Sequence, residues 1–327
     1  MRAMLNRRYG AAADLRLEEI DPPEPAPDHV LVRVRAASVN AGDWRLMRGR
    51  PLIARPIMGG LRGPSPPVRG WDLAGVVESV ADGIDGFAPG DEVFGTGSGT
   101  FAELATARAG TLAPKPAWLS FEEAATIGVA AISALQSLRD RAKVQAGQRV
   151  LVTGAGGGVG SFAVQLAKAY GAEVTAVCSA SKADLVRELG ADRVIDYGAE
   201  DFTRDRRRYD VILDIGGARS IRATRRALAS DGRLIVIGGK GNVVGPLARI
   251  AAVMILKPFA GAQKLMPFLA RTTRADLLEL AGMIETGTVR VVVDRTFELV
   301  DAAAAIRYVE DGRVRGKAVV VVDADPA

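Results

Sequence analysis

The sequence predicts an α/β protein with two domains, a small β-barrel and a doubly wound parallel sheet. Three observations support this. The chain has 327 residues, which suits about two domains better than one ordinary core. Short strands separated by turns fill the first third, and strands alternate with helices from Ser120 onward. A glycine-rich segment at 154–160 joins one of these later strands to a helix.

Composition excludes several classes of protein. Hydrophobic residues make up 48% and charged residues 25%, as in globular proteins, so wholesale disorder, collagen and coiled coil are excluded. Lys+Arg number 43 and Asp+Glu 38, and because the two signs alternate along the chain, the net charge of +5 does not itself indicate a nucleic-acid partner. One cysteine (Cys178) and one histidine (His29) allow neither an internal disulfide nor a zinc site built mainly from those ligands.

Neither export nor a membrane span is expected. The first 19 residues carry charges where a secretory signal needs an apolar core, so we expect a cytoplasmic protein. The most apolar stretch, Ile250–Leu256, is far shorter than the ~20 residues that cross a bilayer. Because Arg249 and Lys257 flank it, we expect a buried or interfacial helix there.

The first part of the chain reads as a β-barrel. The alternation in His29–Val39 predicts a half-buried strand, and Gly70–Ala81 and Asp91–Gly95 are similar, with Asp-Gly and Pro-Gly turns between them. The segment Arg50–Arg69 is rich in proline and glycine and has no period. It predicts a long loop, of the kind that often forms a lid or a binding loop.

From Ser120 the pattern is that of a parallel sheet with helices on both faces. Ser120 and Glu123 form a capping box that starts a helix. Expected strands follow at Arg149–Thr153, Glu173–Cys178, Arg193–Asp196, Asp210–Asp214 and Arg233–Ile237, with helices at Ser161–Tyr170, Lys182–Leu189 and Ile221–Leu228. The tail returns to strands at Val289–Asp294 and Lys317–Val322, with helices at Arg274–Thr286 and Asp301–Glu310. We therefore expect residues 1–125 and 267–327 to form the barrel domain and 126–266 the parallel-sheet domain.

The segment Val150–Val177 carries the strongest functional signal. A buried strand runs into a glycine cluster that opens a helix, and a second strand follows at the right distance. Glycines let the backbone approach a pyrophosphate, and the helix N-terminus offers free N–H groups to it. The best register of the dinucleotide motif is Ala155, Gly157 and Gly160, with alanine in the first place.

The end of the second strand of this unit selects the cofactor. An NAD enzyme has an acidic residue there for the ribose 2′-hydroxyl, whereas this chain has Cys178-Ser-Ala-Ser-Lys182. Lys182 and Ser179 would bind a 2′-phosphate, and Tyr197, after the next strand, could pack beside the adenine or bond the phosphate. The sequence therefore predicts NADPH rather than NADH.

Several motifs fall in the order typical of one superfamily. They are Asn40-Ala-Gly-Asp43, Gly70-Trp-Asp72 with Ala74-Gly75, Pro89-Gly-Asp-Glu-Val93, the loop Ala155–Gly160 and Leu189-Gly-Ala-Asp192. Over nearly its whole length the chain resembles the medium-chain dehydrogenase/reductases, in their zinc-independent quinone oxidoreductase (zeta-crystallin-like) branch. This resemblance implies a GroES-like barrel, a Rossmann domain and a homodimer. It also implies hydride transfer from NADPH to quinones or to the C=C bond of enones and enals.

The resemblance also assigns roles to individual residues. It implies that Asn40 lies near the nicotinamide, and that Ser133 approaches the carboxamide of the cofactor. It places Ile237, Gly238 and Gly239 beside the nicotinamide ribose. The residues expected to hold the pyrophosphate are Gly157, Gly158, Val159 and Gly160.

The catalytic groups are less defined by the sequence. Zinc-dependent relatives have a cysteine near the position of Asn40 and a His-Glu pair where this chain has Trp71-Asp72. Some quinone reductases have a tyrosine at about the place of Arg45. Asn40 and Arg45 are the candidate side-chain donors to a developing negative charge on the substrate oxygen, beside backbone N–H groups and the ribose hydroxyl of the cofactor. The final proton could come from solvent. Asp43 and Asp72 could be acids or could hold the barrel loops.

Two other classes stay open at this point. One is a zinc-free alcohol or ketone dehydrogenase on the same fold. The other is an NADPH-binding protein with a non-catalytic role such as RNA binding, although no nucleic acid is expected beside the small-molecule substrate. The short-chain reductase mechanism is excluded because no tyrosine has a lysine four residues later. A Ser-His-Asp hydrolase does not fit a chain whose single histidine lies in a segment rich in proline and acids.

Overall fold

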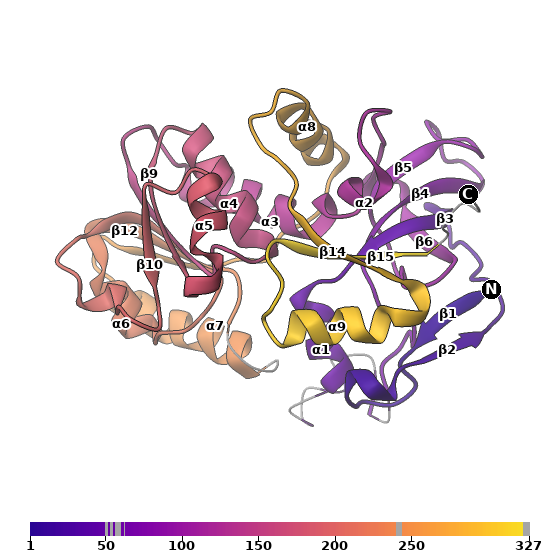
Figure 1. The fold of residues 1–327 in the computed structure, drawn as a ribbon, viewed down its shortest axis with the longest axis horizontal. Helices are drawn as coiled ribbons and strands as arrows, with labels where there is room; N and C mark the ends of the chain where they lie inside the picture. The colour runs from indigo at the N-terminus through magenta and orange to yellow at the C-terminus, as the bar shows by residue number, and fades with distance from the viewer. Residues whose placement is uncertain (50–51, 53–54, 56–59, 62, 240–243, 323–327) are drawn as a thin grey trace. The chain divides into compact units, whose positions relative to one another are not determined.

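The computed structural model describes residues 1–49, 52, 55, 60–61, 63–239 and 244–322, and the chain forms two compact units (Figure 1). The first, called here the barrel unit, comprises Met1–Ile132, Thr272–Met283 and Val291–Ala327. The second, called here the sheet unit, comprises Ser133–Arg271 and Ile284–Arg290. The boundaries expected from the sequence divide the chain into a substrate domain and a cofactor domain, and this division stays a prediction.

The barrel unit is built on a largely antiparallel sheet. Its strand order is β14-β15-β3-β4-β5-β7, with β6 paired to β3, and only β14 and β15 run parallel to each other. The strands are β14 (Val293–Glu298), β15 (Lys317–Val321), β3 (His29–Ser38), β4 (Asp72–Val80), β5 (Glu92–Thr96), β7 (Leu112–Pro114) and β6 (Leu104–Arg108). A separate hairpin is formed by β1 (Arg2–Leu5) and β2 (Arg16–Glu19). The helices include α1 (Ala41–Arg48), α2 (Phe121–Ala124), α8 (Arg274–Glu285) and α9 (Ala302–Glu310).

Strand β3 is more deeply buried than its alternation predicts. It pairs with β4, β6 and β15, so it lies in the middle of the sheet and not at an edge. Its valines Val30, Val32 and Val34 are fully buried and belong to one core with residues of β15 and α9 such as Val320 and Ile306. Burying this apolar surface holds the N-terminal and C-terminal segments of the chain together.

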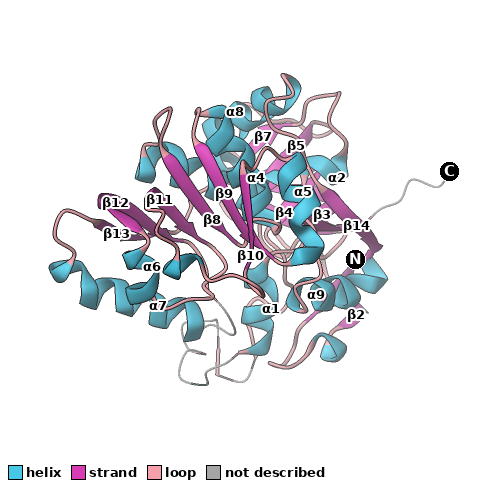
Figure 2. Cartoon of the chain, turned by 60° about the vertical axis from the view of Figure 1, so that its left-hand side comes forward, coloured by secondary structure: helices cyan, strands magenta, loops and turns pink. Residues whose placement is uncertain are grey.

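The sheet unit has the parallel order β10-β9-β8-β11-β12-β13. Figure 2 shows these strands side by side with helices packed against them. The strands are β8 (Arg149–Thr153), β9 (Glu173–Cys178), β10 (Arg193–Asp196), β11 (Tyr209–Asp214), β12 (Leu228–Val236) and β13 (Lys264–Pro267). The helices are α3 (Ile132–Gln136), α4 (Gly158–Ala169), α5 (Ala183–Glu188), α6 (Ile221–Arg226) and α7 (Val244–Leu256). The order reverses beside β8, which makes this a doubly wound, Rossmann-like sheet.

The expectations for one helix and one further strand also differ from the structure. The helix expected as amphipathic at Ser161–Tyr170 is α4, which is buried all along 160–167, because it packs on β8 and β9 and is covered by the helical turn at Ser137–Ala142. The strand expected at Val289–Asp294 begins only at Val293, where pairing with β15 starts. The hairpin β1–β2, helix α1 and strands β6, β7 and β13 were not expected from the sequence.

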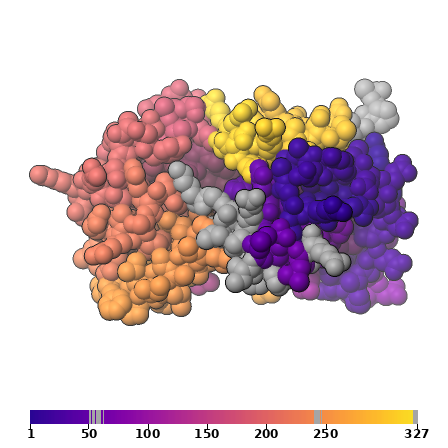
Figure 3. Space-filling model, turned by 90° about the horizontal axis from the view of Figure 1, so that it is seen from below, coloured from indigo at the N-terminus to yellow at the C-terminus, as the bar shows by residue number. Residues whose placement is uncertain are grey.

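Helix α7 contains the most apolar stretch of the chain. Val253 is buried against the sheet, and Arg249 is buried as well and forms an ion pair with Asp214. Ile250 and Ile255, however, are 41% and 68% exposed, so of the two expected alternatives, a buried or an interfacial helix, the buried one is wrong. Figure 3 shows the part of the chain around α7, in orange, at the molecular surface. Among the helices of the described residues, none is both long enough and apolar enough to cross a bilayer.

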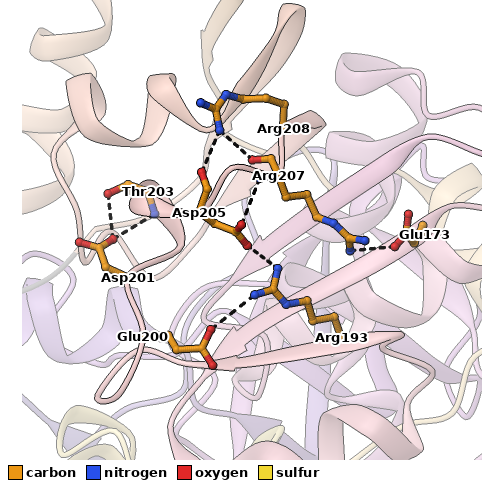
Figure 4. Close-up of polar contacts among 8 residues, drawn as sticks. All are labelled: Glu173, Arg193, Glu200, Asp201, Thr203, Asp205, Arg207 and Arg208. Atoms are coloured by element: carbon orange, nitrogen blue, oxygen red, sulfur yellow. Dashed lines mark hydrogen bonds and ion pairs between the residues drawn. The ribbon is translucent and has the colours of Figure 1, made fainter.

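Ion pairs link the segments that lead into β9, β10 and β11 (Figure 4). Arg193 pairs with Asp205 and with Glu200, and Arg207 donates to Glu173 at 2.8 Å. Arg208 donates to the carbonyl oxygen of Asp205 at 2.8 Å. Arg193, Arg207 and Arg208 are thus matched by acids or carbonyl groups, in line with the alternation of charges along the sequence.

The loop expected at Arg50–Arg69 is only partly described. Positions 50–51, 53–54, 56–59 and 62 lie outside the described residues. Among the others, Val68 forms a bridge with Leu5, and the Tyr9 hydroxyl donates to the carbonyl oxygen of Gly60 at 2.8 Å. The described end of this segment is thus attached to the barrel, and its role as a lid stays a prediction.

Candidate functional site

The glycine loop of the sheet unit joins β8 to α4. Helix α4 begins at Gly158, with Gly157 as its extended N-cap and Val159 in its first turn. Gly160 lies so close to the loop that a Cβ there would collide with the carbonyl oxygen of Gly154. The first N–H groups of α4 lack partners inside the helix, as at any helix start, and such a terminus attracts anions. The structure thus brings Gly157, Gly158, Val159 and Gly160 together at one helix start.

Lys182 lies directly against this loop. A Cβ on Gly156 would be 2.7 Å from the Cβ of Lys182, so the lysine stem covers the glycine backbone. Ser179 directly follows β9, and its hydroxyl lies 3.0 Å from that of Ser181. The segment between β9 and α5 contains no acid before Asp184, which lies past Lys182. A cation and two hydroxyls therefore lie at the end of the sheet that carries the glycine loop.

Tyr197 follows β10, the strand beside β9. Its N–H donates to the carbonyl oxygen of Cys178 at 3.1 Å, which fixes the turn, and its side chain is half exposed. The Cys178 thiol is buried, and burial raises its pKa. Tyr197 is thus a surface side chain beyond β10, whereas Cys178 is a packing residue of β9.

Thr153 and Asp214 connect the ends of the two central strands, β8 and β11, by hydrogen bonds. The Thr153 hydroxyl donates to Asp214 Oδ1 at 2.9 Å and accepts from the N–H groups of Ile215 and Gly216, each at 3.0 Å. Asp214 also forms the buried ion pair with Arg249. The sequence analysis missed these residues, although Thr153 and Asp214 are the last residues of two expected strands.

The turn after β12 is also attached to Asp214. The N–H groups of Ile237 and Gly238 approach the carbonyl oxygen of Asp214 at 3.2 and 3.4 Å. A Cβ on Gly238 would be 2.5 Å from the carbonyl oxygen of Ile215, so this turn needs a glycine, and Gly239 follows it. Ser133 of α3 is buried in the same unit.

A cluster of polar side chains lies buried in the barrel unit, and we call it the buried polar cluster. Its members come from the end of β3, the start of β4, the start of α1 and the start of β15. They are Ser38, Asn40, Asp43, Asp72 and Lys317. Asp72 Oδ2 accepts hydrogen bonds from Ser38 Oγ at 2.6 Å and from Asn40 Nδ2 at 2.8 Å. It also lies 3.2 Å from Lys317 Nζ. Lys317 was not foreseen as a site residue, because it lies 245 positions from Asp72 in the chain.

Asp43 is a buried carboxyl group with a shifted pKa. Its pKa is raised from the ordinary value of 3.8 to about 7. Burial is the main cause and the nearby charge of Asp72 adds to it, against a hydrogen bond from the N–H of Asn40 and the charges of Lys317 and Arg69. That N–H donates to Asp43 Oδ2 at 2.7 Å and caps α1. A cavity of about 50 Å³ lies beside Asp43 and the buried Arg69. Asp43 therefore holds the start of α1 and can bind a proton near neutral pH.

The remaining candidates of the barrel unit lie around helix α1. The Arg45 guanidinium is half-buried and stacks 4.9 Å from the ring of Trp44, and burial lowers its pKa. Trp71 packs so closely on α1 that a Cβ on Gly42 would collide with its ring. Trp71 thus has a structural task, while Asn40 and Arg45 stay candidates for contact with substrate.

We find no group of three or more His, Cys, Asp or Glu side chains arranged to hold a metal ion in the described part of the chain. Asp72, at the position that carries a metal ligand in zinc-dependent relatives, is paired with Lys317.

A Rossmann-like sheet with a glycine loop and a barrel with a buried polar cluster together define a class, the dehydrogenases and reductases that pair these two folds. The alcohol dehydrogenase GroES-like domain family matches residues 26–117, and the family described as zinc-binding dehydrogenase matches residues 189–320. The chain is 31% identical to the chloroplast envelope quinone oxidoreductase homolog of Arabidopsis thaliana, over 98% of each chain. It is also 31% identical to the 2-methylene-furan-3-one reductase of Solanum lycopersicum, over 98% of this chain and 79% of the other.

Solved structures agree with these relatives. The quinone oxidoreductase of Coxiella burnetii superimposes with a TM-score of 0.88 at 27% identity, over 99% of both chains. The Escherichia coli quinone oxidoreductase complexed with NADPH gives 0.85 at 25% identity, over 98% of this chain and 100% of the other. The chain therefore belongs to the medium-chain dehydrogenase/reductase family, among the quinone oxidoreductases. It is an oxidoreductase of that family, and the resemblance and fold class inferred from the sequence are confirmed.

Proposed function

We propose that this chain transfers a hydride from NADPH to a quinone or to the C=C bond of an α,β-unsaturated carbonyl compound, without zinc. The observation that carries the proposal is the packing of Lys182 on the glycine loop, at a strand end that offers hydroxyls and no acid. The relatives point the same way. One of them is described as a reductase of an unsaturated furanone, and a related structure contains NADPH.

The residues of the sheet unit fit this cofactor. The start of α4, with Gly157, Gly158, Val159 and Gly160, would hold the pyrophosphate by backbone N–H groups. Lys182 and Ser179 would bind the 2′-phosphate, and Tyr197 would cover the adenine. Ser133 and the turn Ile237-Gly238-Gly239 would orient the nicotinamide end. When bound, the cofactor supplies the hydride and its electron pair, and the protein holds the reacting carbons in line.

The barrel unit would bind the substrate. When a hydride adds to the β-carbon of an enone, the C=C electron pair moves and negative charge develops on the carbonyl oxygen. Asn40 and Arg45 are the groups we assign to that oxygen, because hydrogen-bond donors aimed at a developing charge lower the barrier. A solvent proton completes the reduction.

The pairing of Asp72 with Lys317 supports the absence of zinc. An ammonium group already lies 3.2 Å from the carboxylate that would otherwise be free to bind a cation. The chain also has only one cysteine and one histidine to offer, and zinc sites in proteins depend largely on these two ligand types.

The test is NADPH oxidation, followed by absorbance across a panel of quinones, enals, enones and plain ketones. We expect turnover with the first three classes. Reduction of ketones alone would favour a zinc-free alcohol dehydrogenase. No NADPH oxidation with any acceptor would contradict the proposed function.

Three further features belong to the proposal. We infer that the protein is a homodimer, which the exposed apolar face of α7 supports. We also infer a cytoplasmic location, although the related Arabidopsis protein is described as belonging to the chloroplast envelope. Residues 1–125 and 267–327 would act as the substrate domain and 126–266 as the cofactor domain.

A further inference from the structure

The carboxamide of Asn40 is held by opposite charges at its two ends. Its Nδ2 donates to Asp72 Oδ2 at 2.8 Å, and its Oδ1 accepts from Lys317 Nζ at 2.8 Å. A carboxylate can only accept hydrogen bonds and an ammonium can only donate them. A flipped carboxamide would therefore place its NH₂ against Lys317 and its oxygen against Asp72. This pair of charges leaves the side chain one orientation.

Lys317 has no hydrogen left for a substrate. Besides Asn40 Oδ1, its ammonium approaches Asp72 Oδ2 at 3.2 Å and the carbonyl oxygen of Val39 at 3.4 Å. An ammonium has three hydrogens, so these three acceptors use all of them. The side chain is also only 2% exposed. Lys317 is thus suited to orient Asn40 and not to donate a proton.

Asp72 is itself fixed, so the clamp on Asn40 is rigid. Its Oδ2 also accepts from Ser38 Oγ at 2.6 Å. Ser38, Asp72 and Lys317 stand on β3, β4 and β15, and β3 is paired with both other strands. Within the described residues, the second hydrogen of Asn40 Nδ2 is the one donor of this carboxamide that no acceptor uses.

We propose that Lys317 is a positioning residue for the reaction. It holds Asn40 Oδ1 so that the second Nδ2 hydrogen stays directed at the substrate oxygen. This inference rests on the proposed function, because it takes Asn40 as the donor to the developing negative charge. It adds a residue from the last described strand of the barrel unit to a site that the sequence places around Asn40.

A double-mutant cycle on the hydride-transfer rate tests the inference. Lys317→Met, Asn40→Ala and the double variant are compared with the unchanged protein in single-turnover experiments with NADPH and the best acceptor. We expect Lys317→Met to lower the rate about 10- to 100-fold, because a catalytic hydrogen-bond donor contributes roughly 100-fold or more. In the Asn40→Ala background the same change should have no further effect, because non-additivity marks residues that act as a unit. The dissociation constant for NADPH should stay the same throughout.

Outcomes that contradict the inference are equally clear. An equal fold-loss in both backgrounds would show that Lys317 acts independently of Asn40. An unchanged rate in folded Lys317→Met protein would show that it is not needed. Lys143→Met, which removes an exposed lysine of the sheet unit, is the matched control and should keep the full rate.

A charge-balanced variant covers the case in which Lys317→Met does not fold. Removing one partner of a buried ion pair leaves an unpaired charge, which is strongly destabilising. Lys317→Met with Asp72→Asn removes both charges and still offers Asn40 Nδ2 an acceptor, while its Oδ1 loses the ammonium. The same rate loss and the same non-additivity with Asn40→Ala are expected, and full activity of this variant would overturn the inference.

A second readout does not depend on activity. The chain has three asparagines, Asn6, Asn40 and Asn242, so protein labelled with ¹⁵N at asparagine gives three side-chain amide signal pairs. We expect the Asn40 pair, assigned by its loss in Asn40→Ala, to shift and to exchange faster with solvent in Lys317→Met. The Asn6 pair, whose Nδ2 donates to the carbonyl oxygen of Arg8, should not change. An unchanged Asn40 pair would overturn the inference even if the proposed function failed for lack of NADPH oxidation.

Discussion

At the scale of single residues, Asp43 links stability to pH. Its pKa is about 7 in the folded protein and near 3.8 in the unfolded chain. Well below pH 3.8 both states are protonated, and ionisation of Asp43 does not change the free energy of unfolding. As the pH rises from about 4 to 7, the unfolded chain ionises while the folded protein keeps the proton. The free energy of unfolding therefore falls by about 4 kcal/mol in total over this window and is constant at higher pH.

Asn at position 43 isolates this contribution. Asp43→Asn cannot ionise, and its carbonyl oxygen can still accept the bond from the N–H of Asn40. Relative to the unchanged protein, we expect the variant to gain about 2–3 kcal/mol of unfolding free energy between pH 5 and pH 8. Urea unfolding at the two pH values measures this difference. A difference that does not change with pH would mean that Asp43 ionises normally in its buried position.

Lys182 is the residue whose change should alter cofactor preference. Lys182→Ala removes the cation from the end of β9, and an ionic hydrogen bond to a phosphate contributes about 1.5–3 kcal/mol. We expect the KM for NADPH to rise on the order of 10-fold or more, while the KM for NADH changes less than about 2-fold. Lys143→Ala, at an exposed position of the same unit, should change neither constant. Equal effects on the two cofactors would exclude a contact with the 2′-phosphate.

Residues of the cofactor side were easier to predict than those of the substrate side. Gly157, Gly160 and Lys182 belong to one strand–helix–strand unit. The glycine motif and the order of the strands in that unit are therefore enough to place them near one another. The buried polar cluster joins Asn40, Asp72 and Lys317 from three distant segments. A single buried lysine at the start of a C-terminal strand has no local signal, since only the pairing of β15 with β3 brings it to Asn40.

At the scale of elements, the sequence predicted best where strand and helix alternate. Strands β8, β9 and β10 have the predicted bounds, because each is a short apolar run closed by glycine or polar residues. Strand β13, at the sheet edge, was missed because it has four residues and ends in Pro267, which weakens a strand signal. Helix α1 was missed since its sequence mixes glycine, charge and tryptophan, and its capping bond between Asn40 and Asp43 becomes evident only in the structure.

Helix α4 gives a prediction about the glycine loop. In Gly160→Ala the new methyl group would collide with the backbone of Gly154 and Ala155, so the loop or the helix start must move. We expect a loss of about 1–3 kcal/mol in unfolding free energy, together with weaker NADPH binding in a fluorescence titration.

The matched control is Gly282→Ala in helix α8, where a Cβ has no atom within 4 Å. Alanine favours a helix interior over glycine by about 1 kcal/mol, so this variant should be as stable as the unchanged protein or more so. If Gly160→Ala behaved like Gly282→Ala, the close approach at the loop would not be a constraint in solution.

At the scale of the whole molecule, composition bears on metal dependence. A chain with one cysteine and one histidine, whose Asp72 is paired with Lys317, should need no zinc. We expect NADPH oxidation with the best acceptor to survive prolonged dialysis against a strong chelator, with metal content checked by mass spectrometry. A loss of activity that added zinc restores would contradict this prediction.

The exposed apolar face of α7 bears on assembly. Leu247, Ile250, Met254 and Ile255 are all at least 41% exposed, and α7 packs beside β13, the edge strand of the sheet. A free edge flanked by exposed apolar side chains is a surface that proteins normally cover. A second copy of the chain would cover both at once, which is why we propose this face as the contact of the inferred homodimer.

Light scattering coupled to size exclusion tests that assembly. The unchanged protein should have twice the 34.3 kDa mass of the chain. Ile255→Glu should shift it to the single mass, because burying an unpaired carboxylate in an apolar contact costs several kcal/mol. Val300→Glu, at a 57% exposed valine of the barrel unit, should leave the dimer intact. A dimer that survives Ile255→Glu would place the contact elsewhere, whereas dissociation by Val300→Glu as well would point to a general effect of added charge.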